Sequence, residues 1–357
     1  MTSVQLQKID QSSGRLKVLR ELDLNVESGQ YLVLLGASGG GKTTILRIIA
    51  GLQAPDSGSV QLGDEDVTRI APRSRNVAMV FQHDALYPHL TVDGSIRLAL
   101  KKIFSRTEVD RRVSETARLT GIESFLDRYP HHLSGGQLRR AAIAKALARE
   151  SGLRLLDEPL SSLDGEARES LQDDILQWHR ALGGTTIHVT HDGQEAMRMA
   201  DKIAVLQDGR IVQVGDPVEI YRQPQTLAVA RAIGSPTIQC FEVDTSPDSG
   251  PCVLKDVGVA LNAEPPTHDK VEWVVAVRPE SLKVVDTESD DAHQDAIRIP
   301  GVLQRRANLG RDVMLTIRCG EKRVTAIARS AAADLEIGDP VYVCAETAHL
   351  HWFEANP

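Results

Sequence analysis

The chain has few cysteines and few aromatic residues, and it has no long hydrophobic run. Its four cysteines, Cys240, Cys252, Cys319 and Cys344, all lie in the last third of 357 residues and form no C-x-x-C pair. This spacing indicates neither a zinc site nor a redox motif. No apolar run approaches the ~20 residues of a membrane-spanning helix, and the first residues lack the basic and apolar segments of a secretory signal. We therefore expect free thiols in a reducing cytosol.

Length and charge set further bounds. The formal net charge is −8, with 25% charged and 41% hydrophobic residues, which is ordinary for a globular protein. The acidic balance argues against a nucleic-acid-binding surface over the whole molecule, although a local basic patch is still compatible with it. A length of 357 residues suffices for two or three domains.

A glycine-rich stretch carries the clearest chemistry in the sequence. It fits the pattern G-x-x-x-x-G-K-[ST], with an apolar run at 31–35 before it and helical spacing at 45–50 after it. A strand, a glycine-rich turn and a helix form the context in which this pattern binds phosphate, whereas an ordinary glycine-rich turn needs none of them. The expected nucleotide-binding residues are Gly36, Ala37, Ser38, Gly39, Gly40, Gly41, Lys42, Thr43 and Thr44.

The residue types explain this expectation. Glycines allow backbone N–H groups to surround a polyphosphate, and the helix N-terminus adds partial positive charge. Lys42 is expected to reach the β- and γ-phosphates, and the Thr43 hydroxyl is expected to bind Mg²⁺.

Strand and helix patterns alternate through most of the chain. Strands are predicted at 4–9, 22–26, 31–35, 76–81, 153–158 and 185–190, with a hairpin turn at Asp208-Gly209. Helical spacing dominates a region of about 83–152 and returns at 163–182. This alternation predicts a mostly parallel sheet with strand ends lining the site. Beyond Gly234 nearly every segment has strand character, which suggests a small barrel or sandwich, so two domains are predicted, 1–235 and 236–357.

A set of motifs in fixed order resembles the ATPase subunit of an ATP-binding cassette (ABC) transporter. Residues 36–43 resemble its Walker A motif, Gln82 its Q-loop glutamine, residues 133–137 its signature sequence, residues 155–159 its Walker B motif with the catalytic glutamate, residues 161–164 its D-loop, and His191 its H-loop histidine. The signature matches letter for letter. One motif alone could arise by chance, whereas the ordered set is highly specific.

The resemblance extends over essentially the whole chain. Residues 85–92, 215–221 and 233–236 are similar to importers of the maltose type, and residues 278–280 and 309–310 resemble their C-terminal domain. The implied fold is an α/β P-loop ABC-type domain with a mostly parallel core sheet, an antiparallel β subdomain and a helical subdomain. An all-β OB-type (TOBE/MOBE-like) domain for regulation and dimerisation follows it.

The resemblance also implies a role for each motif residue. Asp157 is expected to hold Mg²⁺ together with Thr43 and Gln82, and Glu158 to act as the general base on the attacking water. Adjacent positions at a strand end direct the two carboxylates to different sides. His191 is expected to contact the γ-phosphate, and Gln82 to sense Mg²⁺ and the water.

The signature residues are expected to act on a second subunit. The resemblance implies that Ser134, Gly135, Gly136 and Gln137 close on the nucleotide of the opposite subunit, with Asp164 at the interface. The functional assembly is then a head-to-tail dimer that holds two ATP molecules, and the binding of ATP drives its closure. Transmembrane permease subunits and, indirectly, a solute-binding protein are the implied partners, at the cytoplasmic face of the inner membrane.

The resemblance favours energising the import of a carbohydrate or polyol. The alternatives are a polyamine, iron or other anion importer, a soluble ABC ATPase acting on DNA or ribosomes, and a module that holds nucleotide but turns over poorly. The chain has one cassette and no extended heptads, which argues against a soluble ABC ATPase acting on DNA or ribosomes. Glu158 and His191 argue against a module that turns over poorly.

The adenine-binding region departs from the family pattern. The family places an aromatic residue in a loop that corresponds to 11–18, near Ser13, but the first aromatic residue in this chain is Tyr31. Leu16 or Val18 is expected to pack on the base instead, without the ~0.5–1.5 kcal/mol of aromatic stacking. We therefore expect weaker nucleotide affinity or selectivity.

Two further positions are unusual for the family. Arg154 stands in a strand position that is normally apolar, so we expect it to pair with a carboxylate or to reach solvent. Residues 138–140, Leu-Arg-Arg, follow the signature where the family usually has a polar, glutamine-rich start to the helix. Neither departure removes a catalytic group.

Overall fold

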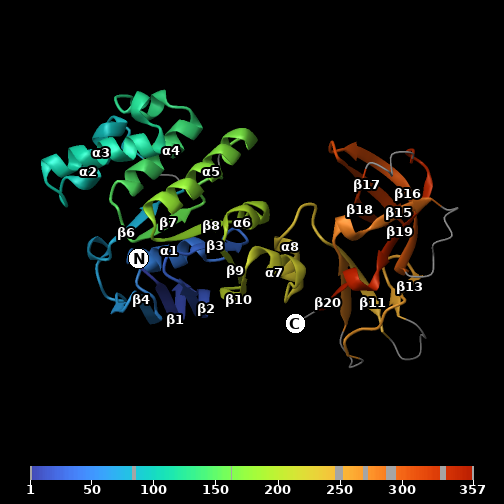
Figure 1. Ribbon diagram of the computed structural model, residues 1–357. Coiled ribbons are helices and arrows are strands. Elements are labelled where there is room, and N and C mark those ends of the chain that lie inside the picture. The colour runs from blue at the N-terminus through green and yellow to red at the C-terminus, as the bar shows by residue number, and fades with distance from the viewer. Residues whose placement is uncertain are drawn as a thin grey trace. The chain divides into compact units, whose positions relative to one another are not determined.

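The computed structural model describes residues 2–82, 86–161, 163–245, 252–267, 272–286, 295–329 and 335–355. The chain divides into two compact units, 1–225 and 226–357 (Figure 1). The sequence places its boundary later, at the turn around Gly234, and that boundary stays a prediction. No helix among the described residues is both long and apolar enough to span a bilayer.

A six-stranded sheet forms the centre of the first unit, in the order β10-β9-β3-β8-β7-β6. Its strands are β3 (Tyr31–Gly36), β6 (Val77–Val80), β7 (Leu153–Asp157), β8 (Thr185–Thr190), β9 (Lys202–Gln207) and β10 (Arg210–Gly215). All pairings are parallel except that of β10 with β9. Every residue of β3, β7 and β8 is buried, because helices cover both faces of such a sheet. The mostly parallel core sheet is thus confirmed.

Parallel pairing has a direct consequence for the site. The carboxyl ends of β3, β6, β7 and β8 meet at one edge of the sheet, where ligands bind in open α/β folds. The helices that follow three of these strands are α1 (Lys42–Ala50), α5 (Gly165–Leu182) and α6 (Gly193–Met199); α7 (Pro217–Arg222) follows β10.

A second, antiparallel sheet packs against α1 and the central sheet. Its order is β2-β1-β4-β5, with β1 (Val4–Ser13), β2 (Leu16–Val26), β4 (Ser57–Leu62) and β5 (Glu65–Asp66). Leu6 and Val60 of this sheet share one apolar core with Ile45 of α1 and Leu34 of β3. The antiparallel β subdomain is therefore present as expected.

Three helices group together between β6 and β7 in the chain (Figure 1). They are α2 (Val92–Leu100), α3 (Arg106–Thr120) and α4 (Gly135–Leu147), with short 3₁₀ turns at Glu123–Phe125 and Pro130–His132; a further 3₁₀ turn, Pro72–Ser74, precedes β6. Thr91, Ser105 and Ser134 cap their N-termini by accepting backbone N–H groups. Their apolar faces form a separate core that includes Ile96 and Val113.

The second unit is built almost entirely of strands. After α8 (Leu227–Ala232) come two five-stranded sheets, β13-β12-β11-β14-β20 and β15-β19-β16-β17-β18. The strands are β11 (Gln239–Asp244), β12 (Val253–Leu254), β13 (Val259–Ala260), β14 (Trp273–Val277), β15 (Lys283–Asp286), β16 (Asp295–Asn308), β17 (Asp312–Cys319), β18 (Lys322–Arg329), β19 (Pro340–Glu346) and β20 (His351–Glu354), with 3₁₀ turns at Pro279–Ser281 and Thr347–His349. Both sheets contribute to one apolar core that contains Phe241, Val275 and Ile317.

Candidate active site

The glycine-rich loop joins β3 to α1 at the ligand-binding edge of the sheet. Gly41 has φ 100°, in the left-handed region that favours glycine. A Cβ at this position would lie 2.9 Å from Leu19 Cδ2, so the loop needs glycine for its backbone and for the close approach of β2. The expected strand, turn and helix around residues 36–44 are all present.

Lys42 is buried beneath this loop. It is 4% exposed, and its Nζ donates to the carbonyl oxygens of Gly36 at 2.9 Å and Ala37 at 2.8 Å. Burial lowers the pKa of Lys42, while the charges of Glu158 and Asp157 oppose that shift. The lysine ammonium therefore lies between the phosphate loop and two carboxylates.

Thr43 and Asp157 meet across the site. The Thr43 hydroxyl donates to Asp157 Oδ1 at 2.9 Å, although the residues lie on α1 and at the end of β7. Burial raises the pKa of Asp157, and the Thr43 hydrogen bond opposes the shift. Hydroxyl and carboxylate oxygens are the ligands that Mg²⁺ prefers, so this pair fits the ion.

Glu158 lies at the centre of a second group of side chains. Gln82 Nε2 donates to its Oε2 at 3.0 Å, and His191 Nδ1 lies 3.4 Å from its Oε1. A hollow of about 40 Å³ borders Glu158 and His191, which is room for about one water molecule. The carboxylate thus has an amide on one oxygen and an imidazole by the other.

The backbone explains why the two neighbouring carboxylates separate. Strand β7 ends at Asp157, and Glu158 has φ 45°, which is uncommon for a residue with a side chain. Its N–H donates to Val189 O at 3.0 Å, and Ser161 Oγ donates to its carbonyl oxygen at 3.1 Å. A left-handed turn, rather than the strand alternation expected from the sequence, directs Glu158 away from Asp157.

The signature residues form a different site at the start of α4. The Ser134 hydroxyl accepts from Gln137 N at 3.3 Å, and Gln137 Oε1 accepts from Ser134 N at 3.2 Å, which is a capping box. Ser134 and Gly135 are exposed and Gly136 is half-buried. No hydrogen bond within the described part of the chain joins them to the phosphate loop.

Asp164 has a local structural role. It is the N-cap of α5, and its Oδ1 accepts from Ala167 N at 3.0 Å. Of the predicted D-loop, Ser162 lies outside the described residues, as do His83 and Ala85 in the stretch after Gln82.

Val18 lies close to the phosphate loop, in the region that lacks the expected aromatic residue. Its Cγ1 would be 3.1 Å from a Cβ on Gly41, whereas Leu16 is 66% exposed. Tyr31 is fully buried, and its hydroxyl is hydrogen-bonded to His188 Nδ1 at 2.8 Å.

A buried polar cluster beneath His191 was not foreseen from the sequence. The His188 ring and the Glu195 carboxylate are 2.6 Å apart (Nε2 to Oε1), and Thr190 Oγ1 donates to Glu195 Oε2 at 3.1 Å. A histidine inside a run of β-branched residues at 185–190, seven residues before a glutamate, is the signal that could have indicated it. The cluster fixes the strand end that carries His191.

Arg154 does not behave as expected. It is 5% exposed, so it does not reach solvent, and no carboxylate among the described residues lies within ion-pair distance of it. Its guanidinium instead donates to the Gly183 carbonyl and, at 3.5 Å, to the Thr186 hydroxyl. A peptide carbonyl exposed at the C-terminus of α5 replaces the predicted carboxylate, and burial lowers the pKa of Arg154.

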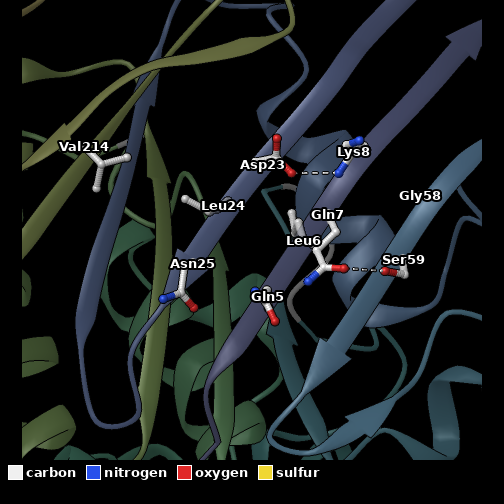
Figure 2. A pocket seen from close by; sticks show the side chains of 10 residues that line it. All are labelled: Gln5, Leu6, Gln7, Lys8, Asp23, Leu24, Asn25, Gly58, Ser59 and Val214. Atoms are coloured by element: carbon white, nitrogen blue, oxygen red, sulfur yellow. Dashed lines mark hydrogen bonds between the residues drawn. The ribbon is translucent and has the colours of Figure 1, made fainter.

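A larger hollow lies away from these residues, on the antiparallel sheet. Its volume is about 780 Å³, and residues of β1, β2, β4 and Val214 line it (Figure 2). The Lys8 N–H donates to Asp23 Oδ1 at 2.9 Å there. None of the predicted site residues lines it, so we do not assign it to the active site.

Comparisons with known proteins identify the family. Residues 19–161 match the ABC transporter family model, and residues 275–353 match the TOBE domain model. The sn-glycerol-3-phosphate import ATP-binding protein UgpC of Rhizobium meliloti (strain 1021) is 38% identical over 96% of this chain and 95% of that protein. The uncharacterized ABC transporter ATP-binding protein y4oS of Sinorhizobium fredii (strain NBRC 101917 / NGR234) is 35% identical over 100% of this chain and 94% of that protein.

Solved structures agree with this result. The dimeric cassette MJ0796, described as a bacterial ABC transporter cassette, has a TM-score of 0.55 and 28% identity, and covers 60% of this chain and 98% of that one. A post-hydrolysis dimer of the same cassette bound to ADP and Pi has a TM-score of 0.54 and 29% identity.

Fold and motifs together define an ATPase of the ATP-binding cassette class. The chain belongs to the family of ABC transporter ATP-binding proteins and carries a TOBE domain after its cassette. It binds and hydrolyses ATP as a transporter subunit, and the fold expected from the motifs is confirmed.

Proposed function

We propose that the chain hydrolyses ATP to energise the import of a carbohydrate or polyol derivative through an ABC transporter. The arrangement of Gln82 and His191 around the Glu158 carboxylate carries the mechanism. The relatives named UgpC are import proteins for sn-glycerol-3-phosphate, so a polyol phosphate is the first solute to test. A polyamine, iron or other anion importer is the alternative.

Glu158 acts as the general base in this proposal. Its carboxylate borders the small hollow and takes a proton from the water that attacks the γ-phosphate. The Gln82 amide orients one carboxylate oxygen, and the His191 imidazole holds the attacking geometry. Lys42 and the loop N–H groups offset the negative charge of the phosphates.

Mg²⁺ fits the oxygen pair of Thr43 and Asp157. The part of the chain described holds no cluster of three or more acidic, histidine or cysteine residues suited to a metal, and Thr43 and Asp157 would hold the ion beside the bound nucleotide. When bound, the ion neutralises phosphate charge. The Thr43–Asp157 hydrogen bond orients both oxygens for this purpose, and Gln82 completes the set that we infer from the sequence.

The signature residues recognise the nucleotide of a second subunit. The exposed start of the 13-residue helix α4 offers a capped turn of N–H groups beside Ser134, which favours an anion. A dimeric cassette is among the similar structures, which supports a head-to-tail dimer with Asp164 at the interface. The C-terminal domain, 236–357, adds to dimerisation and regulates it.

A membrane partner docks beside the site. An apolar hollow of about 250 Å³ lies between the end of α1, β6 and α4, and Leu52 and Phe81 at its rim are 51% and 37% exposed. Phe81 directly precedes Gln82, so a helix of a transmembrane permease seated there contacts the residue next to the catalytic amide. The chain is then peripheral to the cytoplasmic face of the inner membrane.

A tagged Glu158→Gln variant tests this proposal. We expect its ATP hydrolysis to fall on the order of 10³-fold, since the carboxamide cannot accept the proton, while ATP still binds and holds the dimer closed. Purified with ATP from gently solubilised native membranes, it should bring down one or two polytopic proteins and a solute-binding protein. Wild-type turnover would remove Glu158 as the base, and soluble partners alone would remove the transport assignment.

A further inference from the structure

Arg139 lies five residues after the signature serine, in the stretch whose charge departs from the family pattern. It belongs to α4, and it is 7% exposed. The start of α4 faces solvent, but the Arg139 side chain extends to the carboxyl ends of β6 and β7. No role in hydrolysis assigned above uses this residue.

The N–H groups of its guanidinium all donate to backbone carbonyl oxygens. Nε donates to Pro159 at 2.6 Å, Nη1 to Phe81 at 2.8 Å and Gln82 at 3.2 Å, and Nη2 to Asp157 at 3.2 Å and Glu158 at 3.0 Å. A guanidinium has five N–H donors in one plane, so the set is complete. The acceptors come from two segments that lie more than 70 residues apart in the chain.

Most of these carbonyls need a partner because the sheet ends there, whereas that of Glu158 has Ser161 Oγ as a further donor, at 3.1 Å. β6 ends at Val80 and β7 at Asp157, and the two strands are neighbours, so the strand ladder supplies no further donors. A buried carbonyl left unpaired costs about 1–3 kcal/mol. Burial lowers the pKa of Arg139 to about 10, and the side chain therefore remains cationic at neutral pH.

The same two segments carry the hydrolytic pair. The Gln82 amide donates to the Glu158 carboxylate, and one guanidinium binds the backbone of both residues. We propose that Arg139 is a positioning residue for hydrolysis, which fixes Gln82 and Glu158 relative to each other and ties both to the signature helix. This inference rests on the proposed roles of these two residues.

The placement has a mechanical consequence. α4 is a single 13-residue helix with the signature at its first turn and Arg139 one turn further on. A shift of α4 on binding the second subunit's nucleotide therefore changes all five hydrogen bonds together. The guanidinium transmits that shift to the water-activating pair in its own subunit.

Arg75 provides a matched control. It is 6% exposed and also donates only to backbone carbonyls, those of Ile48, Ile49, Thr68 and Ile70. None of these residues belongs to the strand ends that carry Gln82 or Glu158. Loss of Arg75 removes a buried guanidinium with the same kind of surroundings from elsewhere in the same unit.

The experiment compares Arg139→Lys with Arg75→Lys in the full chain. A lysine presents one compact ammonium and cannot span both segments. We expect Arg139→Lys to lower kcat at least ~30-fold, because a 1 Å misplacement can cost 10²-fold, with the Kd for ATP changed less than about threefold. Arg75→Lys should keep kcat within about threefold of the wild type, after both variants are checked for their melting temperature.

A second substitution covers poor folding of the lysine variant. Arg139→Gln keeps two neutral N–H donors for part of the carbonyl set without burying an unpaired charge, and it should lose kcat at least as strongly as Arg139→Lys because it cannot reach both segments. In the Glu158→Gln background, either change should lower the residual activity less than about twofold, since Arg139 acts through Glu158.

The outcomes separate the two proposals. Unchanged kcat in Arg139→Lys or Arg139→Gln, an equal loss in Arg75→Lys, or a loss confined to ATP affinity would overturn the positioning role. If Glu158→Gln is inactive while the Arg139 variants are fully active, only this inference fails. If Glu158→Gln retains turnover, the proposed function itself fails.

Discussion

The two units of the chain bury different kinds of side chain. Among the described residues, every buried polar or charged side chain except that of Arg278 belongs to the first unit. The core of the second unit is apolar, with Phe241 and Ile317 at its centre. In the first unit Lys42, Arg139 and Asp157 lie at the carboxyl ends of the parallel strands, where strand pairing stops.

Arg278 resembles Arg75, Arg139 and Arg154 of the first unit, which donate to backbone carbonyls. Its Nη1 donates to the carbonyls of Ala230 at 2.9 Å and Ile233 at 2.6 Å, at the end of α8. The comparison therefore teaches that this chain satisfies orphaned carbonyls with guanidinium groups. In the first unit, Arg139 also lies beside Gln82 and Glu158, the residues that we propose to act in hydrolysis.

Asp157→Asn should give the largest effect and sharpen this contrast. We expect ATPase activity to fall on the order of 10³-fold, because the proposed Mg²⁺ ligand loses its charge, while the free energy of unfolding without nucleotide rises by about 1 kcal/mol. Burial raises the pKa of Asp157, so ionising it costs stability as the pH rises through the usual aspartate range. Denaturant titrations at pH 7 and near pH 4 check the sign.

The gain in stability should shrink as the pH falls, because the wild-type carboxyl is then already neutral in both states. An Asp157→Asn variant that is less stable than the wild type at pH 7 would show that the ionised Asp157 carboxylate does not destabilise the fold.

Phe241→Ala tests the apolar unit. Truncating a fully buried phenylalanine should cost about 3–5 kcal/mol, and we expect the second unit to lose its protection against proteolysis. The Kd for ATP should stay within about threefold, since the nucleotide-binding residues lie in the first unit. A large loss of ATP affinity would contradict the expectation that the first unit binds nucleotide independently of the second.

Val18→Tyr tests the missing aromatic residue. Val18 lies beside Gly41, so a tyrosine there should gain about 0.5–1.5 kcal/mol of stacking, which is roughly 2- to 10-fold in ATP affinity. Titrations with ATP and GTP measure the gain and the selectivity, with Leu52→Tyr as an exposed control. Micromolar or tighter ATP binding by the wild type, with strong selection against GTP, would contradict the expected weakness.

The cysteines give the smallest effect. Burial raises the pKa of Cys319 to about 11, and Cys344 is also buried, whereas Cys240 and Cys252 are half-buried. Alkylation at pH 8 should therefore label Cys240 and Cys252 first, and label Cys319 only after unfolding. Mass spectrometry of time points checks this order.

Local patterns predicted much of the fold. The phosphate loop, the buried parallel strands and the hairpin at Asp208-Gly209 all depend on neighbouring residues, and the structure contains each of them. The order of the motifs was enough to identify the family. The site residues named from that order lie in the phosphate loop and α1, just after or at the ends of β6, β7 and β8, and at the starts of α4 and α5.

The sequence could not reveal contacts between distant segments. Arg139 looked like a departure from a pattern, because its acceptors Phe81 and Glu158 are not neighbours in the chain. The prediction that Arg154 pairs with a carboxylate or reaches solvent was wrong for the same reason, since its acceptor is a backbone carbonyl, which any residue type provides. The handedness of the turn at Glu158 depends on the Val189 carbonyl, which belongs to another strand.

That turn has a consequence for protein engineering. At a φ of 45°, glycine fits position 158 without strain, and non-glycine residues in such regions cost of order 1–3 kcal/mol. A library selected for heat resistance alone would therefore enrich glycine at position 158 and deliver stable proteins that lack the proposed general base. Selection for thermostable variants of this chain needs an activity screen at every round.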